Sequence, residues 1–93
     1  MLESDPHNKL ALYGLAMELA NTGHPQQAID QYERLLQVDP NYVAAYFHAG
    51  RAAEQMDDSE LARGYYERGI QKAKAVGDRH ALSELQAALD LLG

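Results

Sequence analysis

Residues 28–37 have the sequence AIDQYERLLQ, and residues 62–71 have the sequence ARGYYERGIQ. An offset of 34 residues superimposes the two stretches and aligns five identical residues: Ala28 with Ala62, Tyr32 with Tyr66, Glu33 with Glu67, Arg34 with Arg68 and Gln37 with Gln71. The same offset carries Asp5 and Pro6 onto Asp39 and Pro40. Identities held in one register over this distance predict an internal repeat.

Each repeat is predicted to contain two helices. In the first repeat, Asp5 is expected to cap a helix, and Pro6 suits its first turn because the N–H that proline lacks has no partner there. Residues 21–25 interrupt the helical pattern, and Pro25 begins the second helix, which ends at Asp39 and Pro40. The expected buried residues are Leu12, Leu15, Leu19, Ala11 and Ala16 in the first helix, and Ala28, Ile29, Tyr32, Leu35 and Leu36 in the second.

The second repeat predicts a helix over about 41–55, a turn at 56–58 and a helix from a Ser59 cap to Gly77. Its expected buried residues are Val43, Tyr46, Ala49, Gly50, Ala53, Leu61, Ala62, Tyr65, Tyr66 and Ile70. Asp78 is expected to cap a fifth helix, whose leucines at 82, 85 and 89 have the spacing of those at 12, 15 and 19. Because the end of a repeat stack needs a cover, residues 78–92 are interpreted as a capping helix.

This pattern resembles the tetratricopeptide repeat family. The resemblance rests on the 34-residue period and on the motif positions Leu12, Leu15, Ala16, Leu19, Gly23, Ala28, Tyr32, Leu35 and Pro40 of the first unit, with Tyr46, Ala49, Gly50, Ala53, Ala62 and Tyr66 of the second. It implies an all-α, right-handed helix-turn-helix solenoid in a single domain, with repeats at about 5–40 and 41–76 and the cap at about 78–92. Leu12 replaces the tryptophan that the family favours. Two full repeats are fewer than the three that usually give stability, so the chain is either a fragment of a longer protein or self-associates.

Composition argues against several classes of function. The chain has 93 residues, a net charge of −6 and no cysteine, and residues 1–60 hold ten acids and three bases. An acidic chain repels phosphates, which disfavours nucleic-acid binding; the excess of acids serves either solubility or the steering of a basic partner. No signal peptide or membrane span is expected, and the expected location is the cytoplasm. The four histidines lack metal-ligand spacing and no nucleotide or nucleophile motif occurs, so we expect neither a cofactor nor an enzyme.

The resemblance further implies a groove lined by the first helix of each unit. The residues that match groove-facing positions are Tyr13, Met17, Asn21, Phe47, His48, Arg51 and Glu54, flanked by Leu10 and Gln55, with His80, Ser83, Glu84 and Ala87 from the cap. Arg51 either grips a carboxylate or carbonyl of a partner, or forms a surface ion pair with Glu54 or Glu18. The Lys, Asn and Arg clamp with which some family members hold a C-terminal carboxylate is absent, so that ligand is not carried over.

These expectations favour a protein-interaction module that binds a peptide or helix of a partner. Its motivation is the set of aromatic, methionine and arginine side chains on one predicted face, since such residues are enriched at interfaces. An alternative explanation is that single exposed apolar residues need no function. A rival function is self-assembly into a homo-oligomer, through Leu2, Tyr42, Leu91 and Leu92 at the ends of the stack.

Overall fold

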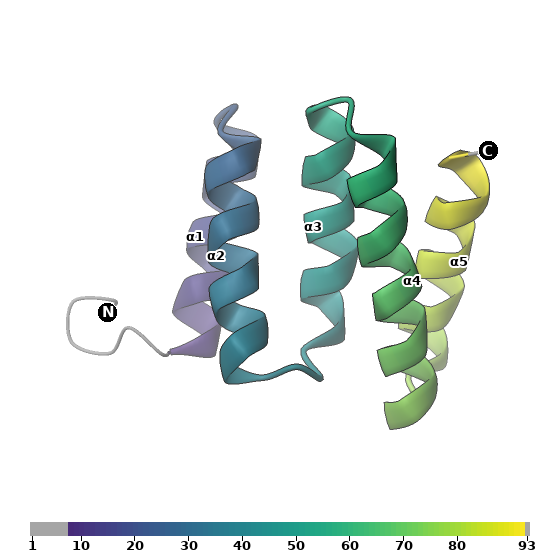
Figure 1. Ribbon diagram of the computed structural model, residues 1–93. Helices are drawn as coiled ribbons and strands as arrows, with labels where there is room; N and C mark the ends of the chain where they lie inside the picture. The colour runs from purple at the N-terminus through teal and green to yellow at the C-terminus, as the bar shows by residue number, and fades with distance from the viewer. Residues whose placement is uncertain (1–7, 93) are drawn as a thin grey trace.

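The computed structural model describes residues 8–92, which form five α-helices and no strand (Figure 1). The helices are α1 (Lys9–Asn21), α2 (Pro25–Val38), α3 (Val43–Gln55), α4 (Ser59–Val76) and α5 (Arg79–Leu92). The prediction of an all-α repeat fold with five helices is therefore confirmed. Within the described residues, no helix combines the length and the apolar character needed to cross a membrane.

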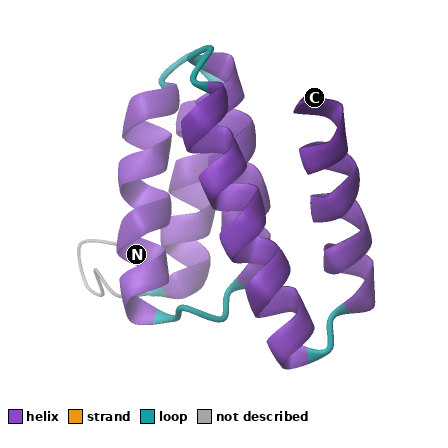
Figure 2. Cartoon of the chain, turned by 45° about the vertical axis from the view of Figure 1, so that its right-hand side comes forward, coloured by secondary structure: helices purple, strands orange, loops and turns teal. Residues whose placement is uncertain are grey.

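The helices pack as consecutive antiparallel neighbours. Helix α1 pairs with α2, α3 pairs with α4, and α5 packs on α4 with a smaller contact to α3. Figure 2 shows the short connections that reverse the chain between one helix and the next. Gly77, between α4 and α5, has a φ of 75°, a left-handed conformation that glycine adopts without steric cost. This is the stop that the sequence predicted.

Two predicted helix caps are corrected by the structure. The first helix begins at Lys9, where the Asn8 side chain accepts a hydrogen bond from Ala11 N–H at 3.0 Å; the predicted cap Asp5 lies outside the described residues. Asp58, and not Ser59, caps α4, because its carboxylate accepts from Leu61 N–H at 3.1 Å. A carboxylate at this position also complements the positive end of the helix dipole.

Hydrogen bonds from backbone N–H groups to aspartate side chains also determine where α3 and α5 begin. The Asp39 carboxylate accepts a hydrogen bond from Asn41 N–H at 3.0 Å, which holds the turn after Pro40, so α3 begins at Val43 and not at about residue 41. Asp78 accepts from Ala81 N–H at 3.0 Å, which confirms the predicted cap of α5.

The core is built from tyrosine rings and very small residues. Tyr32 and Tyr66 are both 0% exposed, and Gly50 lies directly against the Tyr66 ring. A Cβ added at Gly50 would stand 2.7 Å from two ring carbons of Tyr66 and closer still to a third. The small residue at this position is therefore what lets α3 and α4 approach each other.

The predicted leucine stripe of the first helix is only partly buried. Leu12 and Ala16 are buried, whereas Leu15 and Leu19 are half-buried. The residues at the same positions in the second repeat, Ala49 and Ala53, are fully buried. The difference follows from position in the stack, because α1 packs chiefly on α2 at an open end while α3 lies between neighbours.

Contacts of α2 with the second repeat join the two units. The Glu33 carboxylate accepts a hydrogen bond from the Tyr65 hydroxyl and lies 3.6 Å from the Arg68 guanidinium. The Tyr46 hydroxyl donates to the carbonyl of Pro40 at 2.8 Å, which ties α3 to the turn before it. These bonds fix the angle between the repeats on the α2 side.

The contact between Gly50 and Tyr66 predicts opposite effects of alanine at two glycines. Gly50→Ala should lower the free energy of unfolding by about 1–3 kcal/mol, because the ring must move. Gly14→Ala should raise it by about 0.5–1 kcal/mol, because Gly14 is helical and nothing lies within 4 Å of the added carbon. Urea unfolding of the two variants measures both effects, and a Gly50→Ala protein as stable as wild type would refute the tight contact.

Candidate functional site

Two clefts meet on the same face of α3. The α1–α3 cleft has a volume of about 270 Å³ and is lined by Met17, Ala20, Asn21, Tyr32, Phe47, His48, Arg51, Ala52 and Gln55. The α3–α5 cleft also has a volume of about 270 Å³ and is lined by Val43, Ala44, Phe47, His48, Asp78, His80, Ala81 and Glu84. Because Phe47 and His48 line both, the two clefts adjoin each other on α3, and together they are called the groove.

Most of the sequence-predicted groove residues meet in this groove. Met17, Asn21, Phe47, His48 and Arg51 line the α1–α3 cleft together with Gln55. His80 and Glu84 line the α3–α5 cleft. The structure places Ser83 and Ala87 in a separate depression of about 490 Å³ that also includes Lys74 and Arg79.

Tyr13 supports the groove from below and is not part of its lining. Its ring centroid lies 5.6 Å from that of His48, 5.4 Å from that of Tyr42 and 6.3 Å from that of Tyr32. Burial is the main cause that raises the pKa of the Tyr13 hydroxyl, with smaller contributions from Tyr42 and Glu84. The ring therefore positions His48, and its hydroxyl stays protonated at neutral pH.

Arg51 is available to a ligand. Its guanidinium carbon lies 5.8 Å from the centroid of the Phe47 ring, a cation–π distance. Within residues 8–92 it forms no ion pair, so the surface ion pair with Glu54 or Glu18 that the sequence left open is not made. A guanidinium held over an aromatic ring keeps its N–H donors free for an acceptor.

His48 is partly withdrawn from solvent at the centre of the groove. Its ring centroid lies 5.2 Å from that of Phe47 and 6.4 Å from that of Tyr32, with which it is stacked. Burial lowers the pKa of His48 below the usual 6.5, and the nearby Arg51 lowers it further, while Glu84 acts in the opposite direction. The imidazole is therefore neutral at pH 7. Within residues 8–92, no three acidic or histidine side chains converge to hold a metal ion.

Glu54 is used inside the fold. Its carboxylate accepts a hydrogen bond from the buried Tyr66 hydroxyl, and it does not line either cleft. Burial and this carboxylate both raise the pKa of Tyr66. At the corresponding positions of the first repeat stand Tyr32 and Ala20. The alanine side chain offers no acceptor, and in the described part of the chain the buried Tyr32 hydroxyl has no hydrogen-bond partner.

The sequence prediction missed the Tyr32 hydroxyl and Asp78 as features of this groove. The signal for the first was present, since the 34-residue offset aligns Glu54 with Ala20. Tyr32 is predicted from the sequence only as a buried core residue, without regard to the hydrogen bonding of its hydroxyl. Asp78 was interpreted only as a helix cap, and it both caps α5 and lines the α3–α5 cleft.

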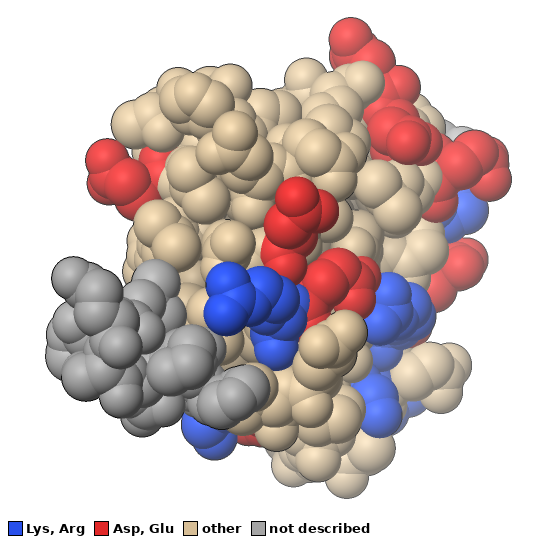
Figure 3. Space-filling model, turned by 60° about the vertical axis from the view of Figure 1, so that its left-hand side comes forward, with Lys and Arg blue, Asp and Glu red and all other residues tan. Residues whose placement is uncertain are grey.

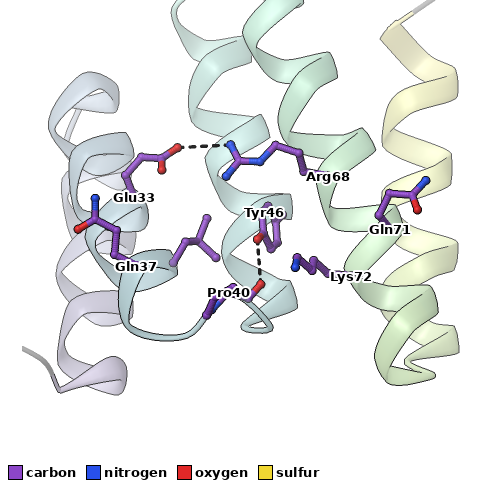
Figure 4. Close-up of a pocket in the computed structure, with 8 residues that line it drawn as sticks. Glu33, Gln37, Pro40, Tyr46, Arg68, Gln71 and Lys72 are labelled. Carbon is purple, nitrogen blue, oxygen red and sulfur yellow. Dashed lines mark hydrogen bonds and ion pairs between the residues drawn. The ribbon is translucent and has the colours of Figure 1, made fainter.

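A further cleft of about 390 Å³ between α2 and α4 is lined by Glu33, Leu36, Gln37, Pro40, Tyr46, Arg68, Gln71 and Lys72 (Figure 4). Two pairs of its lining residues bind each other: Arg68 pairs with Glu33, and the Tyr46 hydroxyl donates to the Pro40 carbonyl. The Arg68 guanidinium also lies 5.3 Å from the ring centroids of both Tyr46 and Tyr65. This cleft is therefore a joint between the repeats and a weaker candidate for a ligand site.

Charge differs between the two halves of the groove. Arg51 is the charged group of the α1–α3 cleft, whereas Asp78 and Glu84 line the α3–α5 cleft, with His80 3.7 Å from Glu84. On the side of the molecule that carries α1 and α2, acidic and basic side chains are interleaved (Figure 3).

Two segments of the chain match the profile of the tetratricopeptide repeat, at residues 10–42 and 43–71. With the helix pairs and the groove across their first helices, these matches define the class: the chain belongs to the tetratricopeptide repeat family. Members of this family generally act as protein-interaction scaffolds without catalysis.

Individual relatives extend the likeness over most of the chain. A tetratricopeptide repeat-containing protein of Pseudomonas aeruginosa is 29% identical, and the match covers 96% of this chain and 85% of that protein. The photosystem I assembly protein Ycf3 of Acaryochloris marina is 31% identical over 77% of this chain. The match spans about half (52%) of the length of the Ycf3 protein.

Solved structures show the same arrangement of helices. The solution structure of a tetratricopeptide repeat domain protein from Salinibacter ruber has a TM-score of 0.86 and 34% identity, with 95% of this chain and 89% of that chain covered. The solution structure of a Bordetella parapertussis protein has a TM-score of 0.88 and 28% identity, with 99% and 80% covered.

The unequal surroundings of the two tyrosine hydroxyls predict unequal costs of removing them. Tyr66→Phe should lower the free energy of unfolding by about 1 kcal/mol, because the bond to Glu54 is lost. Tyr32→Phe should leave it unchanged or raise it, because no bond is lost and a buried polar group is removed. Urea denaturation compares the two variants, and an equal cost for both would mean that the Tyr32 hydroxyl has an acceptor.

The environment of His48 predicts a pH dependence of stability. Its folded-state pKa lies below 6.5, so the unfolded chain binds the proton more readily, and the free energy of unfolding should fall as the pH drops through 6.5. The fall should end once the pH is below the folded-state pKa. Proton NMR titration of the His48 ring gives that pKa directly, and His48→Gln should remove this part of the pH dependence. A pKa at or above 6.5 would contradict the burial.

Proposed function

We propose that this protein binds a segment of a partner protein in the groove formed by the α1–α3 and α3–α5 clefts. The observation that carries the proposal is that the two clefts adjoin each other and share Phe47 and His48 as lining residues. An extended or helical segment can thereby contact three helices at once. The groove offers an aromatic surface at its centre and polar groups toward both ends, the combination that interfaces favour.

The binding role is that of an adaptor without catalysis or cofactor. Family membership supports the general role, and one relative, Ycf3, is by its name an assembly protein for photosystem I. By analogy, this chain would hold one component for assembly with another. We further propose that it acts in the cytoplasm as one domain, with repeats at about 5–40 and 41–76 and a cap at about 78–92.

Self-association is the second candidate function. Leu10 on α1 is 70% exposed, and Leu91 on α5 is 88% exposed, so both ends of the stack carry an exposed large apolar residue. Head-to-tail packing of copies would cover them and would extend the short solenoid. Of the other residues that the sequence proposed for this contact, Tyr42 is half-buried against Tyr13, and Leu2 lies outside the described residues.

The groove proposal predicts that a partner is lost when the centre of the groove is altered. The double variant Phe47→Ala, Arg51→Ala should weaken binding to a captured partner by about 10- to 100-fold, because aromatic and arginine side chains contribute most at such surfaces. Partners would be captured from the lysate of the source organism, and the affinity of each would then be measured with purified protein.

The matched control is Arg34→Ala, Val38→Ala, which removes one arginine and one apolar side chain from exposed positions of α2 outside the groove. Circular dichroism establishes that both variants stay folded. A partner retained equally by both variants would move the interaction to another surface. Recovery of the protein itself alone would favour self-association.

A further inference from the structure

The two repeats differ at one partly buried hydrogen bond. In the second repeat, the Tyr66 hydroxyl donates to the Glu54 carboxylate. In the first repeat, Tyr32 is 0% exposed and its hydroxyl has no hydrogen-bond partner within residues 8–92. Alanine stands at position 20, where the offset places Glu54. A buried hydroxyl without an acceptor is destabilising and uncommon in folded proteins. The described part of the first repeat therefore lacks a carboxylate acceptor such as the one that Glu54 provides for Tyr66 in the second repeat.

An acceptor for the Tyr32 hydroxyl would have to lie in the α1–α3 cleft. Ala20 and Tyr32 both line that cleft, and so does Arg51, whose guanidinium forms no ion pair within residues 8–92. A hydroxyl donor and a guanidinium in one cleft suit a carboxylate, which accepts hydrogen bonds through both of its oxygens. The cleft, with a volume of about 270 Å³, is thus lined by an exposed guanidinium and by a tyrosine whose hydroxyl is buried.

The other half of the groove would reject such a group. Asp78 and Glu84 line the α3–α5 cleft, and their carboxylates repel another one. An acidic residue of a bound segment is therefore directed to the α1 side. This contrast sets the end of the groove at which an acidic residue of the segment lies.

We infer that the α1–α3 cleft holds the side chain of a glutamate or aspartate from the partner segment, bound by the Tyr32 hydroxyl and the Arg51 guanidinium. This inference rests on the proposed peptide-binding function. The acidic side chain takes the place that Glu54 occupies beside Tyr66 in the second repeat. Met17 and Gln55, which also line the cleft, have long unbranched side chains that can move to admit a ligand oxygen to the buried hydroxyl. Gln55 is held only by a 3.4 Å hydrogen bond from its amide to the Ala20 carbonyl.

Three blocked dipeptides test the inference. Acetyl-Glu-Phe-amide presents a side-chain carboxylate, acetyl-Gln-Phe-amide is its neutral isostere, and acetyl-Gln-Phe with a free C-terminus presents a chain-end carboxylate. Binding is followed by NMR at the Met17 methyl and the Gln55 side-chain amide. The first dipeptide should bind at least tenfold more tightly than the other two. Equal binding of the glutamate and glutamine peptides, or preference for the free C-terminus, would overturn the inference.

Variants of the two repeats supply the controls. Tyr32→Phe should reduce the preference for glutamate to less than threefold, and Ala20→Glu should abolish it, because an internal carboxylate then occupies the cleft. Tyr66→Phe removes the partnered hydroxyl of the second repeat and should keep the preference. A preference that survives both Tyr32→Phe and Ala20→Glu would contradict the inference.

Failure of this inference is distinguishable from failure of the proposed function. If no dipeptide perturbs Met17 or Gln55 while Phe47→Ala, Arg51→Ala still loses a partner, the groove binds a segment and the acidic subsite is wrong, with a buried water as the acceptor for Tyr32. If the glutamate preference appears as expected while that double variant keeps every partner, the subsite exists and the proposed function is wrong.

Discussion

The stack depends on tyrosine rings standing where the neighbouring helix has almost no side chain. Tyr66 lies against Gly50, and Tyr46 lies near Gly69, where a Cβ would be 2.7 Å from the tyrosine Cβ and 2.9 Å from a methyl of Leu85. These two glycines therefore set how closely α3, α4 and α5 approach one another. The large rings fill the thin layers between helices, and the glycines make room for the rings, so neither can change size alone.

This packing also explains why the groove lies on α3. With Gly50, Ala49 and Ala53 turned inward, Phe47 and Arg51 stand on the remaining face and border the neighbouring helices. The face is neither fully apolar nor fully charged. Its central aromatic ring lies under a guanidinium, and its histidine is neutral because it is desolvated. The groove therefore has a chemical polarity along its length, with a cationic side at α1 and an acidic side at α5.

Periodicity in the sequence predicted the fold well because the period itself encodes helix pairs. The 34-residue offset located four helices and leucine spacing located the fifth, and the motif positions included Gly50 but not Gly69. It was less accurate at helix starts, where Asp58 and Asn8 compete with nearby residues of similar capping ability and only the backbone geometry decides. Leu15 and Leu19 were overestimated as core residues because periodicity does not show that α1 is at an open end of the stack.

The groove residues were predictable to the extent that helical spacing fixes direction. The family resemblance, combined with helical spacing, predicted Met17, Asn21, Phe47, His48 and Arg51 on one face, and all five line the α1–α3 cleft. Tyr13 and Glu54 lie on the same side of their helices and yet line neither cleft, because one packs beneath His48 and the other bonds to Tyr66. Spacing gives the direction of a side chain, but the partner that it meets depends on helices that are distant in the sequence.

The joint between the repeats is unequal on its two sides. On the α2 side, Glu33 accepts from Tyr65 and pairs with Arg68, and α2 packs broadly on α3. On the α1 side, contact with α3 is slight, and one 3.4 Å hydrogen bond from Gln55 crosses the gap. The two repeats are thus held together mainly on the α2 side, and the α1–α3 cleft lies on the side with fewer contacts between them. A change in the angle between the repeats that alters the width of this cleft would therefore disturb fewer contacts than one that separates α2 from α3.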